Sequence, residues 1–222
     1  VKSHWAIGVR ASIVGNSIPI GVGLGMSLKL KKNKNISVIF LGDAAVETGS
    51  FFESVNFAII KKLPVVFICE NNLYSVYTPL KDGQPQNRKI FKMVEGLGIK
   101  SFHFDGSKPL SFAPKLKKIL NNVRKDSQPC FVEFSTYMYL EHCGPFNDDD
   151  LKYRSKAELK KWSLKDPYLN LKNILSANLK LKKYLYDVEK KNIRNIKSAF
   201  KFAEKSKFPN KNDLFTNVYK KK

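Results

Sequence analysis

The sequence contains no apolar run long enough to cross a membrane as a helix. Its longest uninterrupted apolar run, Val65 to Cys69, has the length of a buried strand. No signal-peptide pattern follows Val1. These absences exclude a protein with helical membrane spans, and we expect a globular protein without membrane contact.

Cysteine is scarce as well, with three residues in the chain. Cys69 and Cys130 fall in apolar runs, where cysteine usually behaves as a small core residue. The three cysteines have no metal-ligand spacing and do not form the even set of a disulfide framework. We therefore expect a reducing compartment and a cytoplasmic protein.

Acidic residues are outnumbered, since 19 Asp and Glu stand against 40 Lys and Arg and give a net charge of +21. Such a charge fits a surface for nucleic acid or for an acidic partner. The basic residues coincide with no nucleic-acid-binding motif, however, and lysine accumulates after residue 150. A solvated lysine-rich surface is therefore the favoured interpretation. Nucleic-acid binding, which salt-dependent DNA binding would support, rests on charge alone.

With 222 residues and 43% apolar content, the chain is long enough for one domain with a full core plus an appendage. Its first residue, Val1, is not a methionine, and glycine and proline positions typical of mid-domain structure follow early in the chain. We therefore expect a fragment that begins inside a domain.

Strand-like and helix-like segments alternate along the first two thirds of the chain. Continuous apolar runs, typical of buried parallel strands, are separated by segments with helical spacing. This alternation predicts an α/β fold with a mainly parallel sheet flanked by helices. The expected strands are residues 36–41, 65–69, 100–104 and 130–136, and the expected helices include 49–62, 89–97 and 116–124.

A lysine-rich helical region is expected to follow this α/β domain. The chain is polar and irregular from Glu141 to Tyr153, and residues 155–205 have the pattern of helices with a thin apolar stripe. Helices of this kind usually pack on the edge of a sheet or on a neighbouring subunit. We therefore expect an α/β domain at residues 1–154 and a helical C-terminal region at residues 155–222.

Polar clusters follow the first two expected strands, at the sheet edge where ligands bind in open α/β folds. Asp43 follows one strand and Asn72 the next, so their side chains meet if the strands are neighbours. A carboxylate, an amide oxygen and a backbone carbonyl near Tyr74 suit Mg²⁺. The small residues Ala44 and Ala45 let backbone N–H groups approach a diphosphate. Taken singly, the aspartate could simply cap the next helix, and the asparagines could form a turn.

The stretch from Gly42 to Pro79 resembles the fingerprint of thiamine-diphosphate-binding proteins, a Gly-Asp-Gly opening and an Asn-Asn close at the same spacing. More narrowly, it resembles the alpha subunit of the decarboxylating first component of 2-oxo acid dehydrogenases, the pyruvate dehydrogenase type. The resemblance extends over roughly residues 10–170. It is carried by SIVGNSIPIGVGLG, GDAAVETGSFFESVNFA, LPVVFICENNLY, FVEFSTYMYLEHCGP and KYRSKAELKKW.

The resemblance implies how the cofactor is held by its diphosphate end. The Asp43 carboxylate, the Asn72 side chain and the Tyr74 carbonyl would bind Mg²⁺. The backbone at Ala44 and Ala45 would meet the diphosphate. The implied fold is the thiamine-diphosphate-binding fold, with a helical C-terminal extension.

The resemblance also implies contacts at the reacting end of the cofactor. The backbone around Ser12 and Val14 would contact the aminopyrimidine ring. His142 matches a loop histidine that lies near the reacting carbon in such subunits, where it can serve as a proton donor or acceptor or orient an acyl unit. Considered without the resemblance, His142 would be a surface loop residue.

The activity implied by the resemblance is the oxidative decarboxylation of a 2-oxo acid such as pyruvate, with thiamine diphosphate and Mg²⁺ as cofactors. The acyl group would pass to a lipoyl-bearing acyltransferase. The glutamate that activates the cofactor normally comes from a beta subunit, so this chain would supply only the diphosphate half of a shared site. We therefore expect an oxidoreductase that is active only with a beta-type partner, in an α2β2 heterotetramer.

Two positions depart from the family pattern. Ala44 stands where the family usually has glycine, and alanine tolerates a close backbone approach only at negative φ. Cys143 stands where animal pyruvate dehydrogenase has a regulatory serine, so phosphorylation there is not expected. The alternatives are an acetoin-type dehydrogenase, a transketolase-like enzyme, which usually carries both halves of the site in one long chain, and a truncated non-catalytic domain.

Overall fold

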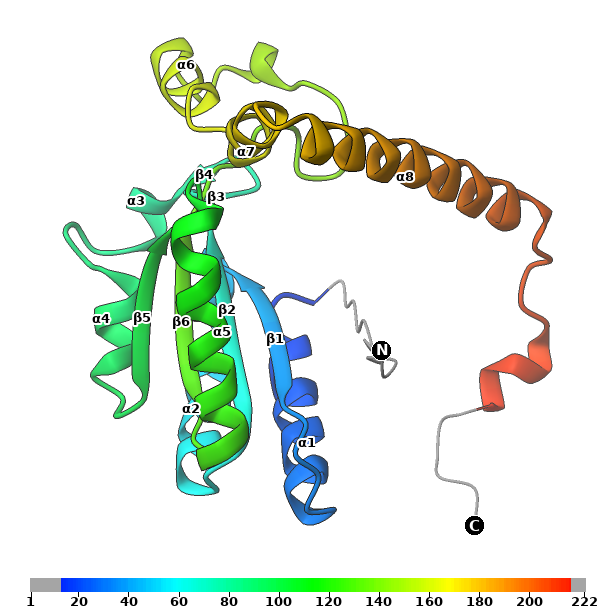
Figure 1. Ribbon diagram of the computed structural model, residues 1–222. Coiled ribbons are helices and arrows are strands. Elements are labelled where there is room, and N and C mark those ends of the chain that lie inside the picture. The colour runs from blue at the N-terminus through cyan, green and yellow to red at the C-terminus, as the bar shows by residue number, and fades with distance from the viewer. Residues whose placement is uncertain (1–12, 217–222) are drawn as a thin grey trace. The chain divides into compact units, whose positions relative to one another are not determined.

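The structure is a computed structural model that describes residues 13–216. The chain divides into two compact units between Tyr168 and Leu169, and the first of them contains the sheet. Figure 1 labels the elements. Their bounds are α1 Ser17–Leu30, β1 Ser37–Gly42, η1 Asp43–Glu47, α2 Gly49–Ile60, β2 Val65–Asn71, β3 Tyr74–Ser75, β4 Thr78–Pro79, α3 Leu80–Gly83, α4 Ile90–Glu95, β5 Lys100–Asp105, α5 Pro109–Asp126, β6 Cys130–Ser135, η2 Asp149–Leu151, α6 Lys156–Ser163, α7 Pro167–Ser176, α8 Leu179–Lys205 and η3 Lys211–Phe215.

Four parallel strands form the main sheet, in the order β1-β2-β6-β5. The two central strands, β2 and β6, are buried over most of their length because helices cover both faces of the sheet. Helices α1, α2 and α4 pack on one face, and α5 packs on the other (Figure 1). The expected α/β fold with a parallel sheet flanked by helices is therefore confirmed.

Aromatic packing fixes α2 on the sheet. Phe51 of α2 is fully buried, and its ring meets the rings of Phe67 and Phe131 edge-on, with centroids 6.2 and 6.0 Å apart. Burying each of these rings contributes about 1.5–3 kcal/mol. Thr48 begins the helix, since its Oγ1 accepts a hydrogen bond from the Phe51 N–H (3.3 Å) and donates to the Ala45 carbonyl (2.8 Å). These two hydrogen bonds connect the end of η1 to the start of α2.

Helix α1 packs closely on the sheet through two glycines one turn apart. A Cβ added at Gly21 would overlap with Ile39, and one added at Gly25 would overlap with Val65, whereas one at Gly23 would meet no atom within 4 Å. We predict that Gly25→Ala lowers the free energy of unfolding by about 1–3 kcal/mol through overpacking. Gly23→Ala is the matched control and raises it by up to about 1 kcal/mol, because alanine favours the helix. Urea unfolding measures both changes, and effects of the same sign would contradict this account of α1.

The first unit extends further along the chain than the composition predicts. We expected a boundary after residue 154, but the compact unit continues to Tyr168 because α6 is bonded to it. The Tyr74 hydroxyl donates to the Glu158 carboxylate of α6 (2.8 Å), and the rings of Tyr137 and Trp162 stack with centroids 5.1 Å apart. The division into two functional domains stays a prediction.

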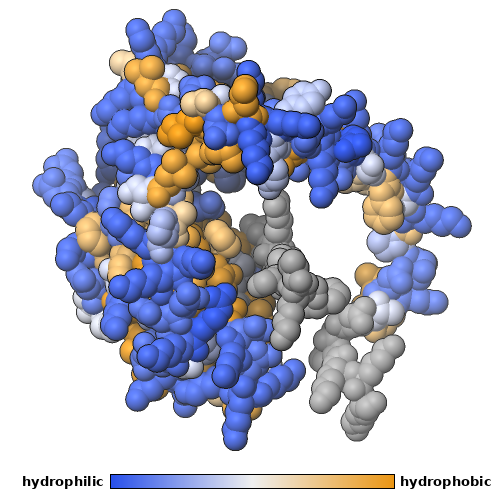
Figure 2. Space-filling view, in the orientation of Figure 1, coloured by the Kyte–Doolittle hydropathy of each residue, from blue (hydrophilic) through white to orange (hydrophobic). Residues whose placement is uncertain are grey.

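The second unit is helical and rich in lysine. Its longest helix, α8, has 27 residues, none of them buried. Lys172 forms an ion pair with Glu189 of α8, with the two charged atoms 2.8 Å apart. Hydrophilic residues dominate the visible surface of α8 (Figure 2). Within residues 13–216, no helix is long and apolar enough to span a membrane.

Candidate functional site

The carboxyl ends of β1 and β2 lie side by side, because Gly42 and Glu70 are partners in the parallel register of these neighbouring strands. Asp43 and Asn72 follow these ends, and the Asn72 N–H donates a hydrogen bond to Asp43 Oδ1 (3.4 Å). Asp43 is 2% exposed. The structure therefore brings the backbone of Asn72 to the side chain of Asp43, two residues that the sequence selected from the ends of separate strands.

Asp43 is a buried carboxylate near other carboxylates. Burial, together with the negative charges of Glu47 and Glu133, raises the pKa of Asp43 to about 6, although two backbone hydrogen bonds act in the opposite direction. Among the described residues, the ion pairs do not include Asp43. A divalent cation beside the Asp43 carboxylate would compensate this concentration of negative charge.

The backbone after β2 forms a turn that the side-chain oxygens of two asparagines stabilise. Asn71 Oδ1 accepts a hydrogen bond from the Leu73 N–H (3.3 Å), and Asn72 Oδ1 accepts one from the Tyr74 N–H (2.9 Å). Between them, Leu73 has a φ of 75°, in the left-handed region. An amide oxygen has two lone pairs, so Asn72 Oδ1 can still bind a cation.

The Tyr74 side chain has a structural position, which leaves the Tyr74 carbonyl as the group available to a cation. The ring is 7% exposed, and its hydroxyl donates to Glu158. Burial, together with this hydrogen bond and the charge of Glu158, raises the pKa of the phenol to about 12. The phenol therefore stays protonated and holds α6.

Ala44 lies in the 3₁₀ helix η1, and its φ is not among the positive φ values of described non-glycine residues. The steric objection to alanine in place of glycine therefore does not apply. A small cavity of about 130 Å³ adjoins this segment and is lined by both carboxylates of η1, Asp43 and Glu47, and by the hydroxyl residues Ser75 and Thr78. Its lining fits a hydrated cation and phosphate oxygens, which need oxygen ligands and donors.

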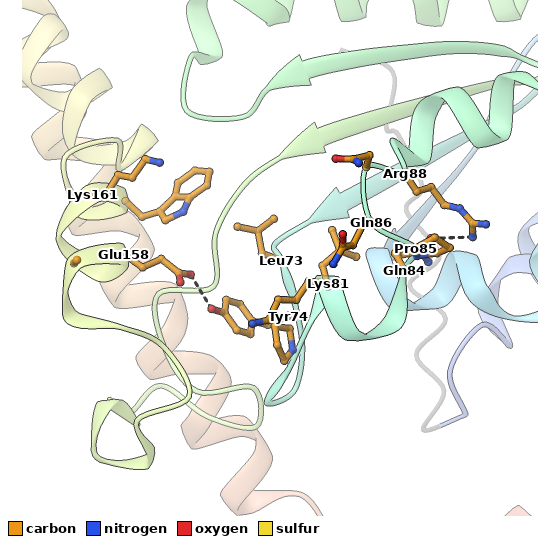
Figure 3. A pocket seen from close by; sticks show the side chains of 14 residues that line it. Leu73, Tyr74, Lys81, Gln84, Pro85, Gln86, Arg88, Glu158 and Lys161 are labelled. Carbon is orange, nitrogen blue, oxygen red and sulfur yellow. Dashed lines mark hydrogen bonds between the residues drawn. The ribbon is translucent and has the colours of Figure 1, made fainter.

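A larger cavity of about 760 Å³ lies beyond the small one and shares Pro79 and Leu80 with it. Figure 3 shows α6 on one side of this cavity and the segment from Leu73 to Arg88 on the other. This segment contains the short hairpin β3–β4 and the helix α3. The Leu80 N–H donates to the Leu73 carbonyl (2.8 Å) and so closes the hairpin.

The turn before α1 approaches the start of α2. A Cβ added at Gly15 would come within 2.8 Å of Thr48 Oγ1. The adjacent Val14 is 64% exposed. The other residue expected to contact the aminopyrimidine ring, Ser12, lies outside the described residues. The expected contacts of this turn with the cofactor stay predictions.

His142 is exposed on the loop that follows β6. Within the described part of the chain, the hydrogen bonds of Asp43 and Asn72 do not involve His142. The loop is anchored by the buried side chain of Arg154, which donates to the Met138 carbonyl and pairs with Asp148. The catalytic role of His142 stays a prediction.

One residue that shapes the site, Glu133, did not emerge from the sequence. Glu133 of β6 accepts a hydrogen bond from Asn71 Nδ2 (2.8 Å), and both side chains are buried. Glu133 is the single charged residue of its strand, and a charge inside an apolar run was the available signal. Within residues 13–216, no group of three His, Cys, Asp or Glu side chains could hold a metal ion. The candidate ligand set is accordingly one carboxylate with neutral oxygens.

Comparison with known proteins gives one consistent result. The family model of the dehydrogenase E1 component matches residues 3–212. The pyruvate dehydrogenase E1 component subunit alpha of Rickettsia bellii is 36% identical over 208 residues, which cover 93% of this chain and 63% of that protein. The chloroplastic subunit alpha-3 of Arabidopsis thaliana is 32% identical over 186 residues, which cover 83% and 42%. The subunit alpha of Zymomonas mobilis is 30% identical over 207 residues, which cover 93% and 57%. The chain thus spans at most 63% of the length of these relatives.

Proposed function

The chain belongs to the dehydrogenase E1 component family, and from this premise we propose that it is the alpha-type subunit of a thiamine-diphosphate-dependent 2-oxo acid dehydrogenase. The observation that carries the proposal is the meeting of Asp43 and Asn72 at the ends of adjacent parallel strands. The named relatives are alpha subunits of pyruvate dehydrogenase, which supports pyruvate or a similar 2-oxo acid as the substrate. Because the chain spans at most 63% of their length, this activity is proposed for the assembled protein.

In this proposal the chain binds the diphosphate end of the cofactor. The Asp43 carboxylate, the Asn72 amide oxygen and the Tyr74 carbonyl hold Mg²⁺, a cation that prefers oxygen ligands. The backbone at Ala44 and Ala45 meets the diphosphate. Three observations support this assignment: the burial of Asp43, the turn that directs Asn72, and the polar cavity beside η1.

The cofactor, when bound, supplies the carbon nucleophile and the electron sink that decarboxylation of a 2-oxo acid requires. The chain's own residues position it. Asp43 and Asn72 would hold the metal, and the backbone around Ser12 and Val14 would contact the aminopyrimidine ring. His142, on a loop at the same edge of the sheet, donates or accepts a proton at the reacting substrate or orients its acyl group.

The proposed partners follow from the division of the site. A beta-type subunit supplies the glutamate that activates the cofactor and completes an α2β2 assembly in the cytoplasm. A lipoyl-bearing acyltransferase accepts the acyl group. The acetoin-type, transketolase-like and non-catalytic alternatives have no observation in their favour. Alanine in place of glycine at position 44 was one reason to consider a non-catalytic domain, and the helical conformation of Ala44 removes that reason.

We predict that the chain with thiamine diphosphate and Mg²⁺ decarboxylates pyruvate only after a beta-type subunit is added, because the activating glutamate is not part of this chain. The measurement is release of carbon dioxide from labelled pyruvate, with an artificial electron acceptor in place of the lipoyl partner. The matched control is the beta-type subunit alone. Turnover by this chain without a partner would contradict the shared site, and no turnover by the saturated assembly would contradict the proposed activity.

A further inference from the structure

Glu133 is a buried carboxylate of β6 that connects two other parts of the fold. It is 4% exposed. Its Oε1 accepts a hydrogen bond from Asn71 Nδ2 (2.8 Å), and its Oε2 accepts one from the Phe91 N–H at the start of α4 (2.8 Å). Both donors are neutral, and the ion pairs among residues 13–216 do not include Glu133. A charge buried in this way costs stability, which points to a function for its position.

The contact with Glu133 determines which way the Asn71 amide faces. With Nδ2 directed at Glu133, Oδ1 is free to accept the Leu73 N–H. Leu73 has a φ of 75°, a conformation that leucine adopts only where its surroundings hold it. Asn72 and Tyr74 flank Leu73, so this turn sets the positions of the two neutral oxygens assigned to the cation.

We propose that Glu133 is a positioning residue for the Mg²⁺ site: its carboxylate fixes the Asn71 amide, and that amide fixes the turn that presents Asn72 and Tyr74. The inference rests on the proposed function, because it takes these two residues as ligands of the cation. Groups that orient metal ligands typically change metal affinity 10–100-fold when they are replaced. The effect reaches the metal through hydrogen bonds, since Glu133 is not itself assigned as a ligand.

Glu133→Gln removes this constraint while preserving shape. Phe91 and Asn71 donate to different oxygens of the Glu133 carboxylate, and a glutamine has an acceptor oxygen at one of these two positions and an NH₂ group at the other. When the glutamine oxygen accepts from the Phe91 N–H, the NH₂ group of the glutamine faces the NH₂ group of Asn71. The Asn71 amide then turns over, and the Leu73 N–H loses its acceptor. In the assembly of the full chain with a beta-type subunit, we expect Mg²⁺ affinity at saturating thiamine diphosphate to fall by at least about tenfold. Glu70→Gln, which removes an exposed carboxylate at the end of β2, is the control and leaves the affinity unchanged.

The double variant Glu133→Gln with Asn71→Asp separates positioning from a merely structural role. In it, the new amide at position 133 donates to the new carboxylate at position 71 and accepts from Phe91. The carboxylate also accepts the Leu73 N–H, so every hydrogen bond and the total charge are restored. We expect Mg²⁺ affinity close to that of the wild type. Amide hydrogen exchange at Leu73 in the cofactor-free chain should be faster in the single variant and return to the wild-type rate in the double variant.

Each outcome decides whether Glu133 positions the ligands of Mg²⁺. A single variant with wild-type Mg²⁺ affinity, or a folded double variant as weak as the single one, overturns the positioning role. If the single variant does not fold, the double variant decides alone, since wild-type affinity supports the proposal and lost affinity overturns it. A wild-type assembly that shows no Mg²⁺-dependent binding of thiamine diphosphate overturns the proposed function, and the inference with it.

Discussion

Asp43→Asn is expected to stabilise the cofactor-free chain and to abolish its Mg²⁺-dependent binding of thiamine diphosphate. Burial, helped by the carboxylates of Glu47 and Glu133, raises the pKa of Asp43 from 3.8 to about 6. One pKa unit corresponds to about 1.4 kcal/mol, so ionised Asp43 destabilises the fold by about 3 kcal/mol. Asparagine has nearly the same shape, keeps an acceptor for the Asn72 N–H and carries no charge. Replacing the metal-binding carboxylate thus raises the stability of the cofactor-free chain. This is typical of residues that serve binding rather than of structural ion pairs.

The pH dependence of this stabilisation follows from the direction of the pKa shift. The pKa of Asp43 is higher in the folded chain than in the unfolded chain, so the folded chain holds the proton more tightly. Below about pH 4, Asp43 is protonated in the folded wild type and does not destabilise it. The wild type loses stability as the pH rises through 6 and Asp43 ionises. The advantage of Asp43→Asn should vanish near pH 4 and be complete above about pH 7.

Urea unfolding of the cofactor-free chain at both pH values measures the stability difference, and calorimetry with and without Mg²⁺ measures cofactor binding. The exposed Glu70→Gln is the control for loss of one negative charge and should change stability by less than about 0.5 kcal/mol. Destabilisation by Asp43→Asn at neutral pH would show that the carboxylate serves the fold. Undiminished Mg²⁺-dependent binding would remove Asp43 from the ligand set.

The pairing of Asp43 with Asn72 could be predicted because short sequence patterns around each residue indicate its position at the end of a strand. Continuous apolar runs identify β1 and β2, and polar residues that follow such runs lie at the edge where ligands bind. That the two strands are neighbours is a matter of strand order, which long-range packing decides. The sequence could therefore state only that the two residues meet if the strands are neighbours, and the structure confirms that the strands are neighbours.

The role of Glu133 could not be predicted, because its partners are distant in the sequence. Asn71 and Phe91 contact it only after β6 is inserted between β2 and β5. The same limit explains the boundary at Tyr168. The polar composition after residue 154 suggested a separate region, but the hydroxyl of Tyr74 and the ring of Tyr137 attach α6 to the first unit.

Arg154→Met is expected to destabilise the first unit by about 3–5 kcal/mol, the usual cost of breaking a buried ion pair. The Arg154 side chain is 1% exposed and that of its partner Asp148 is 6% exposed. Arg154 also donates to the Met138 carbonyl, and Asp148 accepts a hydrogen bond from the Tyr153 hydroxyl (2.7 Å). Removing the guanidinium leaves the Asp148 carboxylate buried without its cation.

Thermal unfolding measures this loss, and the midpoint should fall by on the order of 10 °C. The double variant Arg154→Met with Asp148→Leu is the matched control, because it removes both buried charges, and Asp149, the other partner of Arg154, has a side chain that is 42% exposed to water. It should be more stable than Arg154→Met alone, as is typical when a buried pair is replaced as a whole. Additive effects of the two substitutions would show that the pair does not act as a unit.

The same ion pair links stability to the proposed catalysis, because the loop between Met138 and Arg154 carries His142. In the assembled enzyme, Arg154→Met should lower kcat by loosening this loop while Mg²⁺ affinity stays near the wild-type value. Glu133→Gln should have the opposite pattern, with weakened Mg²⁺ binding and a largely restored kcat at saturating Mg²⁺. Opposite patterns would establish that the metal and the histidine loop are positioned by separate networks. Weakened Mg²⁺ binding in both variants would instead mean that the loop and the metal site form one cooperative unit.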